Sequence, residues 1–131
     1  MVITTKILLQ SSFNFVVDPC YDYKNLSDAS RKSSYKEDKH LCDNKLPEGW
    51  YRFVGAAGTK MPTTRVPAFS CGTVFSGWLM REDAPPSRKV CFSNKESGCK
   101  DIVSISEKEC GSYHIYKLHA TKCPRRYCGS D

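Results

Sequence analysis

Three short segments of the chain alternate between hydrophobic and polar side chains with a period of two, which is the pattern of a half-buried β-strand. They cover residues 50–54, 102–105 and 113–118. Glycine and proline recur between such segments, as in 55–58 and 82–87, and these residues are typical of turns and loops. The sequence therefore predicts a small β-dominated fold in which short antiparallel strands are joined by long loops.

Helical patterning is confined to one stretch. Residues 27–39 have room for a helical turn or two, and Ser27 or Asp28 is of the type that caps the start of a helix. We therefore expect little helix in this fold.

Eight cysteines in 131 residues are the most informative feature of the composition. An even number permits complete pairing, and disulfides persist in oxidising compartments. The closest pair along the chain, Cys123 and Cys128, lacks the C-x2-C spacing of structural zinc sites. We therefore predict a disulfide-rich, secreted or extracellular domain that holds no metal and no other cofactor. The sequence alone does not sort the many connectivities that eight cysteines allow.

The first 17 residues differ in character from the rest of the chain. The apolar run that includes Ile7–Leu9 resembles the start of a signal peptide, but polar residues from Gln10 onward interrupt it before it reaches the usual length. We interpret 1–17 as a poor signal-like or truncated leader and 18–131 as the extracellular domain. A strand over 13–17 is the open alternative. The leader is too short and polar to span a membrane.

A formal net charge of +6 at pH 7 attracts polyanions only where the positive charges lie on one face. Between residues 32 and 45, basic and acidic residues alternate, as in a solvated loop. The denser group of Lys117, Lys122, Arg125 and Arg126 is a candidate for weak contact with a polyanion. An ordinary wet surface is the alternative, because the group is smaller than the usual block of like charges. We expect no nucleic-acid binding.

Several motifs occur in an order that resembles a known family. They are D-P-C at 18–20, G-W-Y-R-F at 49–53, W-L at 78–79, E-C-G at 109–111 and Y-H-I-Y-K-L at 113–118. Residues Asp18 to Cys128 resemble the eight-cysteine domain shared by uromodulin, the major zymogen-granule membrane glycoprotein and the oncoprotein-induced liver zona-pellucida-type protein. The resemblance implies a non-catalytic module for extracellular recognition, adhesion or structure in a larger glycoprotein. Its ligand would be an extracellular protein or a glycan.

The resemblance also implies how the cysteines pair. The implied bridges are Cys20 with Cys110, Cys42 with Cys123, Cys71 with Cys128 and Cys91 with Cys99. Larger family members have a fifth bridge, and its two positions fall at Arg65 and Gly98 here. Both halves of that bridge are missing together, as expected of a chain that avoids a stray thiol.

Family members display N-linked glycans on this domain, but the family positions match Met80 and Lys117 here. The sequence has one N-x-[ST] acceptor, at Asn25. We therefore expect glycosylation at Asn25 if the chain is secreted. A function that depends on the family's glycans does not follow from the fold alone.

Aromatic residues at strand spacing usually supply buried area, so Trp50, Phe53, Tyr113 and Tyr116 are predicted to be core residues rather than a ligand platform. Arg52 lies among these aromatics and is expected to stack on them or to pair internally.

Catalytic patterning is weak. The histidines are His40, His114 and His119, and none has a serine or cysteine nucleophile in a recognisable arrangement. His114, His119 and Lys117 are the set that an acid–base site of ribonuclease type would need. A small basic secreted enzyme or effector of that type is therefore the alternative function, although the cysteine spacing does not fit it. We predict that the chain is not an enzyme.

Overall fold

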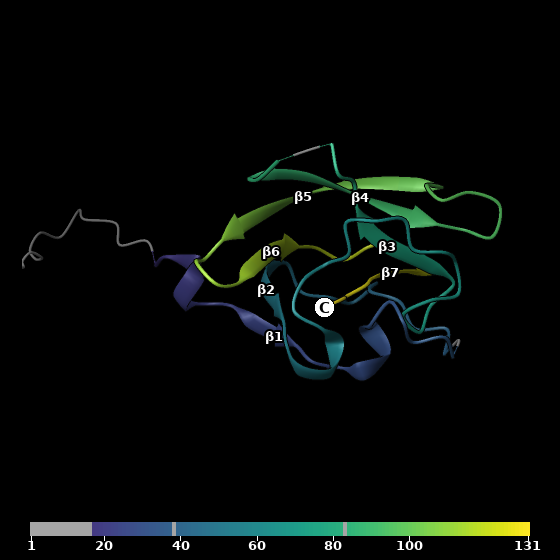
Figure 1. The fold of residues 1–131 in the computed structure, drawn as a ribbon, viewed down its shortest axis with the longest axis horizontal. Helices are drawn as coiled ribbons and strands as arrows, with labels where there is room; N and C mark the ends of the chain where they lie inside the picture. Colours follow the sequence, from purple (N-terminus) through teal and green to yellow (C-terminus); the bar gives the residue numbers. More distant parts are fainter. Residues whose placement is uncertain (1–16, 38, 83) are drawn as a thin grey trace, which may run out of the picture.

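A computed structural model of the chain describes residues 17–37, 39–82 and 84–131, and the described residues form one curled seven-stranded sheet (Figure 1). The strand order is β1-β2-β6-β5-β4-β3-β7. The strands are β1 Lys24–Leu26, β2 Gly49–Phe53, β3 Phe75–Leu79, β4 Ser87–Ser93, β5 Asp101–Glu109, β6 His114–Leu118 and β7 Arg125–Tyr127. The 3-10 helices are η1 Pro19–Tyr21, η2 Ala29–Arg31 and η3 Gly55–Ala57.

The β-dominated fold with long loops and little helix is confirmed. The three predicted strands correspond to β2, β5 and β6. Four of the described strand pairs are antiparallel, as predicted, whereas β1 runs parallel to β2 and β3 runs parallel to β7. Each parallel partner reaches its place through a long connection, so no tight hairpin fixes its direction.

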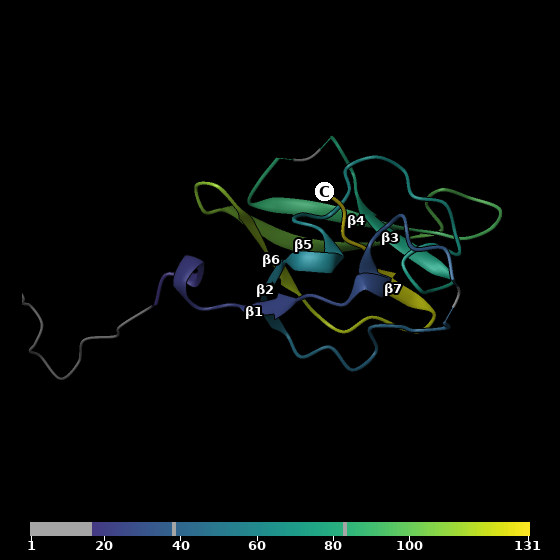
Figure 2. The same ribbon diagram turned by 60° about the horizontal axis from the view of Figure 1, so that its bottom comes forward.

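The sheet curls, and the chain that follows the edge strand β1 runs to the other edge strand, β7 (Figure 2). Lys32 follows the edge strand β1, and it forms an isolated parallel bridge with Gly129, which follows the other edge strand, β7. The backbone N–H of Gly129 donates to the carbonyl of Arg31 at 2.8 Å, and Ser33 donates to the carbonyl of Gly129 at 2.7 Å. These bonds satisfy edge groups that would otherwise be open to pairing with another chain.

The main hydrophobic core fills the inside of this curl. Tyr51 and Phe53 alternate with outward residues along β2, and Tyr116 of β6 packs edge-on against Phe53 with ring centroids 5.9 Å apart. Phe53 and Tyr116 are each 1% exposed, which confirms the prediction for these two. Trp50 and Tyr113 are only half-buried, so the core prediction is wrong for them.

A short helix forms where one was expected. Asp28 caps η2, because its Oδ1 accepts hydrogen bonds at 2.9 Å from both the backbone N–H and the hydroxyl of Ser30. The helix has only three residues and is of the 3-10 type. The alternative strand over 13–17 and most of the leader lie outside the described residues.

Four disulfides join Cys20–Cys110, Cys42–Cys123, Cys71–Cys128 and Cys91–Cys99. These are the pairs that the family resemblance implies. The first two close loops of 90 and 81 residues, and in the chain-entropy model closures of that size each contribute about 4–5 kcal/mol. They fix the N-terminal part of the domain to the end of β5 and to the segment before β7.

Candidate binding surface

The basic group near the C-terminus does not form one surface patch. Arg126 is 6% exposed, and its Nη1 donates to the hydroxyl of Ser30 at 2.9 Å and to the carbonyl of Cys71 at 3.1 Å. Burial lowers the pKa of its guanidinium, which nevertheless remains a cation at neutral pH. Arg125 pairs with Asp101 at 2.6 Å.

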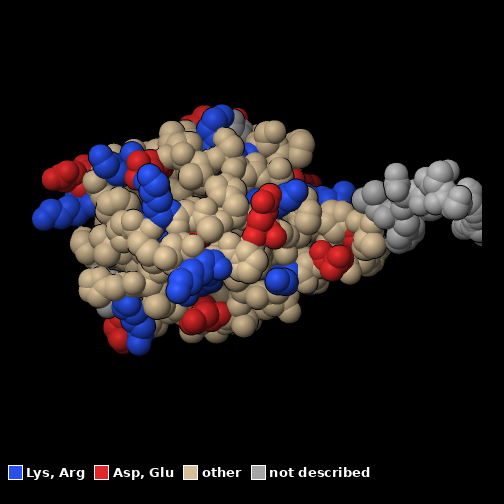
Figure 3. Space-filling model, turned by 180° about the vertical axis from the view of Figure 1, so that it is seen from behind, with Lys and Arg blue, Asp and Glu red and all other residues tan. Residues whose placement is uncertain are grey.

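The candidate polyanion contact is therefore corrected. Of its four members, two act inside the domain or in an ion pair, and Lys117 and Lys122 remain exposed. The face seen in Figure 3 likewise shows cationic and anionic side chains next to each other rather than a field of one sign.

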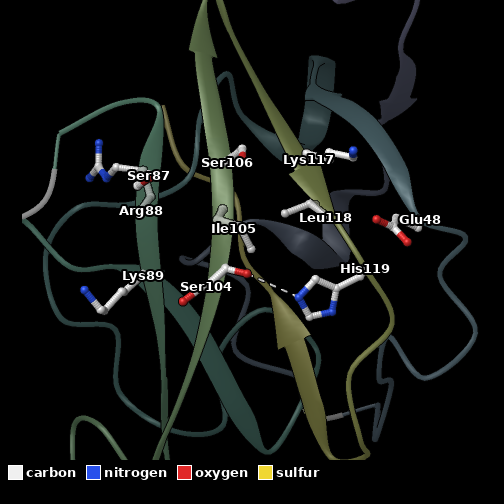
Figure 4. A pocket seen from close by; sticks show the side chains of 10 residues that line it. All are labelled: Glu48, Ser87, Arg88, Lys89, Ser104, Ile105, Ser106, Lys117, Leu118 and His119. Atoms are coloured by element: carbon white, nitrogen blue, oxygen red, sulfur yellow. Dashed lines mark hydrogen bonds between the residues drawn. The ribbon is translucent and has the colours of Figure 1, made fainter.

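A groove of about 440 Å³ lies on the outer face of β4, β5 and β6 (Figure 4). Strand alternation produces its polar lining, because side chains two residues apart point to the same face. Lining residues are Glu48, Ser87, Arg88, Lys89, Ser104, Ile105, Ser106, Lys117, Leu118 and His119.

The register of the three strands aligns the polar side chains of the groove. Ser106 lies opposite Ser87 of β4 on one side and opposite Lys117 of β6 on the other. Ser104 lies opposite Lys89. Paired positions in neighbouring strands bring their Cβ atoms to about 5 Å. The hydroxyls of Ser104 and Ser106 therefore lie between the lysines of β4 and β6, and that of Ser87 lies on the β4 side.

His119 closes one end of this floor. Its Nδ1 lies 3.0 Å from the carbonyl oxygen of Ala120, and its Nε2 lies 3.3 Å from that of Ser104. A neutral imidazole has one N–H and can donate to one of these acceptors, whereas a protonated imidazole donates to both.

The groove is cationic with one acidic flank. Lys89 lies on one side, and Lys117 and Glu48 lie on the other, with His119 and Ser104 between them (Figure 4). Such a lining offers hydroxyls that donate and accept, cations that bind an acidic group, and a carboxylate that accepts from hydroxyls. It suits a hydrophilic ligand that has both hydroxyls and an acidic group.

A buried charged cluster lies on the opposite face of the same strands. Glu107, 4% exposed, accepts from Arg88 Nη1 at 2.7 Å through Oε1, and its Oε2 lies 2.7 Å from His114 Nδ1. Arg88 also donates to the carbonyl of Met80 at 3.1 Å. Burial raises the pKa of the neighbouring phenol of Tyr116. This cluster holds β4, β5 and β6 in register.

The structure does not bring the two C-terminal histidines together. His114 opens β6 and is tied to Glu107, whereas His119 follows the end of the strand and lines the groove. Five residues of extended strand span roughly 17 Å. Among the described residues, no three His, Cys, Asp or Glu side chains gather as ligands of a metal ion would.

Asn25, the candidate glycosylation residue, is exposed in the edge strand β1, where it lies opposite Arg52. Sequence patterns did not single out the groove residues Ser87, Ser104 and Ser106, or Glu48. Serines on the solvent face of a strand form no motif, and the one available signal was the alternation within β4 and β5.

Comparison with known proteins identifies the fold family. The family model described as a uromodulin-like domain matches residues 51–129. The chain belongs to this family. It is 37% identical over 128 residues to the pancreatic secretory granule membrane major glycoprotein GP2 of Rattus norvegicus, covering 90% of this chain and 24% of the relative. It is 36% identical over 118 residues to GP2 of Canis lupus familiaris, covering 85% and 23%. Uromodulin of Mus musculus is 34% identical over 118 residues, with 85% and 18% covered.

The family resemblance stated from the sequence is thus confirmed. The chain spans about a quarter or less of the length of these relatives, 24% in the rat protein. As a disulfide-rich uromodulin-like domain, it is extracellular. In the part of the chain that the structure describes, no helix is long and apolar enough to cross a membrane.

Proposed function

We propose that this uromodulin-like domain is a non-catalytic recognition module, and that it binds an acidic oligosaccharide in the groove over β4, β5 and β6. The observation that supports the proposal is the lining of that groove, in which Ser104 and Ser106 of β5 lie between Lys89 of β4 and Lys117 of β6, and Ser87 adds a hydroxyl on the Lys89 side. Sugar hydroxyls need donors and acceptors, and an acidic sugar also needs a cation.

The size of the groove supports the same ligand class. Its volume of about 440 Å³ falls within the range of small-ligand sites, ~300–1,000 Å³. Strands β4 and β6 flank β5, so they lie about 10 Å apart. Sites for drug-like ligands are mostly apolar, whereas this one is polar, which favours a sugar over an apolar molecule.

The ribonuclease-like alternative is disfavoured by geometry. General acid–base catalysis needs both proton-transfer groups within hydrogen-bond reach of one reacting centre. His114 and His119 lie at opposite ends of β6, and His114 is held by Glu107 at 2.7 Å. These two histidines are therefore too far apart to transfer protons at one phosphate.

Calorimetric titration of the domain tests the proposal with sialyllactose, a heparin-derived tetrasaccharide and neutral lactose. We expect saturable binding of an acidic oligosaccharide and none of lactose. An exposed ion pair contributes about 0.2–1 kcal/mol, so Lys117→Gln should weaken binding by roughly 1.4- to fivefold. Lys95→Gln is the matched control, because Lys95 is exposed and does not line the groove.

Three outcomes count against the proposal. If lactose binds as tightly as the acidic sugars, the lysines of the groove have no role in binding. Equal weakening by Lys95→Gln and Lys117→Gln indicates attraction by net charge only. Absence of saturable binding for both acidic sugars removes the glycan site itself.

A further inference from the structure

Most buried and half-buried arginines of the described residues pair with a carboxylate. Arg31 pairs with Asp43 at 2.6 Å, Arg88 with Glu107 at 2.7 Å, and the partners of Arg125 and Arg126 are Asp101 and Asp28. Arg52 of β2 is half-buried and, among the residues that the structure describes, has no carboxylate partner. The local structure holds this cation without neutralising it.

Two tyrosines hold the Arg52 side chain in place. Its Cζ lies 3.9 Å from the centroid of the Tyr113 ring, and its Nη1 donates to the hydroxyl of Tyr23 at 3.0 Å. The two rings contact each other with centroids 5.8 Å apart. Stacking and one hydrogen bond fix the plane of the guanidinium, while the described bonds leave Nε and Nη2 available for a planar acceptor. The sequence-based expectation that Arg52 stacks internally is confirmed by this geometry.

A hydrogen bond and a disulfide anchor the base of this cluster. The hydroxyl of Tyr113 donates to the carbonyl of Cys20 at 2.6 Å, and the Cys20–Cys110 disulfide joins η1 to the residue after β5. Because the groups are already ordered, a partner that binds here meets a smaller entropic cost of ordering side chains.

Further aromatic residues lie on η1 and β2, near Tyr23 and Arg52 in the chain. Tyr21 on η1 is 83% exposed, and a cavity of about 250 Å³ is lined by Asp22, Tyr23, Lys24, Gly49 and Trp50. Tyrosine, tryptophan and arginine are the residue types most enriched at the energetic centres of protein–protein interfaces. Tyrosine also offers a large contact area at low conformational cost.

We propose that Arg52, Tyr21, Tyr23 and Tyr113 form a second binding site, at which a protein partner places an aspartate or glutamate side chain against the Arg52 guanidinium. The carboxylate accepts from the available guanidinium donors, in the bidentate manner that arginine supports. The tyrosines and Trp50 contact apolar side chains beside that carboxylate. A small free anion would leave this aromatic surface uncovered, which is why a protein partner fits better.

Nuclear magnetic resonance of the isotope-labelled domain tests this site with two blocked peptides, acetyl-Gly-Leu-Glu-Leu-Gly-amide and its Gln analogue, and with acetate. We expect the Glu peptide to shift the side-chain Nε–H resonance of Arg52 and the amides of Tyr21 and Tyr23. Loss of a charge-assisted pair is worth about tenfold in affinity, so the Gln peptide and the Arg52→Gln variant should bind about tenfold more weakly.

Two further variants keep the test decisive if Arg52→Gln fails to fold. Tyr21→Ala changes an exposed residue, and it should weaken the Glu peptide severalfold while leaving the response to acetate unchanged. Arg81→Gln removes an exposed arginine outside the cluster and should have no effect.

Each contrary result overturns the proposal. If the Glu and Gln peptides bind equally, the carboxylate has no role in binding. If Tyr21→Ala binds the peptide as wild type does, the aromatic surface has no role. Acetate that binds as tightly as the Glu peptide reduces the site to one for small anions. If sialyllactose shifts the Arg52 Nε–H resonance and the Glu peptide does not, the site binds a glycan instead of a protein.

Discussion

The side chain of Arg65 lies against Gly98, in the space that a Cβ atom at position 98 would occupy. The Cδ and Cζ atoms of Arg65 stand 2.6 and 2.7 Å from that ideal Cβ position, so any larger residue at 98 displaces the arginine. These are the two positions at which the family resemblance places the missing fifth bridge. They face each other across the loop before β3 and the segment between β4 and β5.

The double change Arg65→Cys with Gly98→Cys should therefore form a fifth disulfide. The cysteine at 65 removes the side chain that conflicts with a Cβ at 98, and bridging requires Cα atoms within about 7 Å. The bridge should stabilise the fold by at most about 3–4 kcal/mol. Mass spectrometry without reductant checks the result. Each single change should leave one reactive thiol, and a double variant in which both new thiols stay free would show that the two positions do not meet.

The purified chain should contain no titratable thiol when it is denatured without reductant, because all eight cysteines lie in bridges. A thiol reagent measures this directly, and peptide mapping of the unreduced chain checks the four pairs. Reduction should expose eight thiols. Detection of two or more thiols before reduction contradicts the disulfide arrangement.

Expression through a secretory pathway should add one N-glycan, at the exposed Asn25. Asn25→Gln should remove all glycosidase-sensitive mass, whereas Asn44→Gln, which lies in no acceptor motif, should keep it. Intact mass before and after glycosidase treatment is the measurement. Wild-type chain without such mass means that Asn25 is unmodified.

Gly129→Ala should destabilise the fold strongly. An added Cβ would collide with the carbonyl oxygen of Ala57, which is backbone and cannot rotate away, and would lie 2.7 Å from Cδ2 of Phe53. Overpacking of this kind costs about 1–3 kcal/mol. Gly49→Ala is the matched control, because a Cβ there meets no atom within 4 Å. Urea denaturation compares the two, and equal stabilities would contradict the packing around Gly129.

Asp28→Ala should lower stability at neutral pH by about 1 kcal/mol, because the cap of η2 is lost. The hydrogen bonds from Ser30 hold the pKa of Asp28 below its usual value. A carboxylate whose pKa is lower in the folded state stabilises the fold at pH values above its unfolded pKa, and this stabilisation is lost as the pH falls through the folded pKa. The difference in the free energy of unfolding between wild type and variant should therefore stay constant from pH 7 to about pH 5 and shrink below about pH 4.

Urea denaturation of both chains across this pH range is the measurement. Glu96→Ala removes an exposed carboxylate that caps no helix, and it should show no such pH-dependent difference. If wild type and Asp28→Ala differ in free energy of unfolding by the same amount at low and neutral pH, the charge of Asp28 does not stabilise the helix.

The sequence by itself determined the features that rest on local spacing and on family resemblance. Alternation within β2 placed Tyr51 and Phe53 on one face, and the structure buries both. The helix-cap type of Asp28 also followed from its neighbours along the chain, whereas the ring on which Arg52 stacks belongs to Tyr113 in a distant segment. The patterns did not predict strand β3. Its Gly77 stands where Phe92 and the carbonyl of Arg126 would approach within 3 Å of a Cβ atom, a contact that only the fold creates.

Only the tertiary structure decided which residues meet from distant strands. Arg126 reads as a surface cation in the sequence, yet it is buried against Ser30 and Cys71 because β7 lies parallel to β3 at the sheet edge. The groove likewise depends on the register that places Ser106 between Ser87 and Lys117. Strand order depends on packing and on disulfides between residues far apart in the chain, which local patterns do not reveal. Alternation tells which face of a strand is buried, but it does not tell which strand lies beside it.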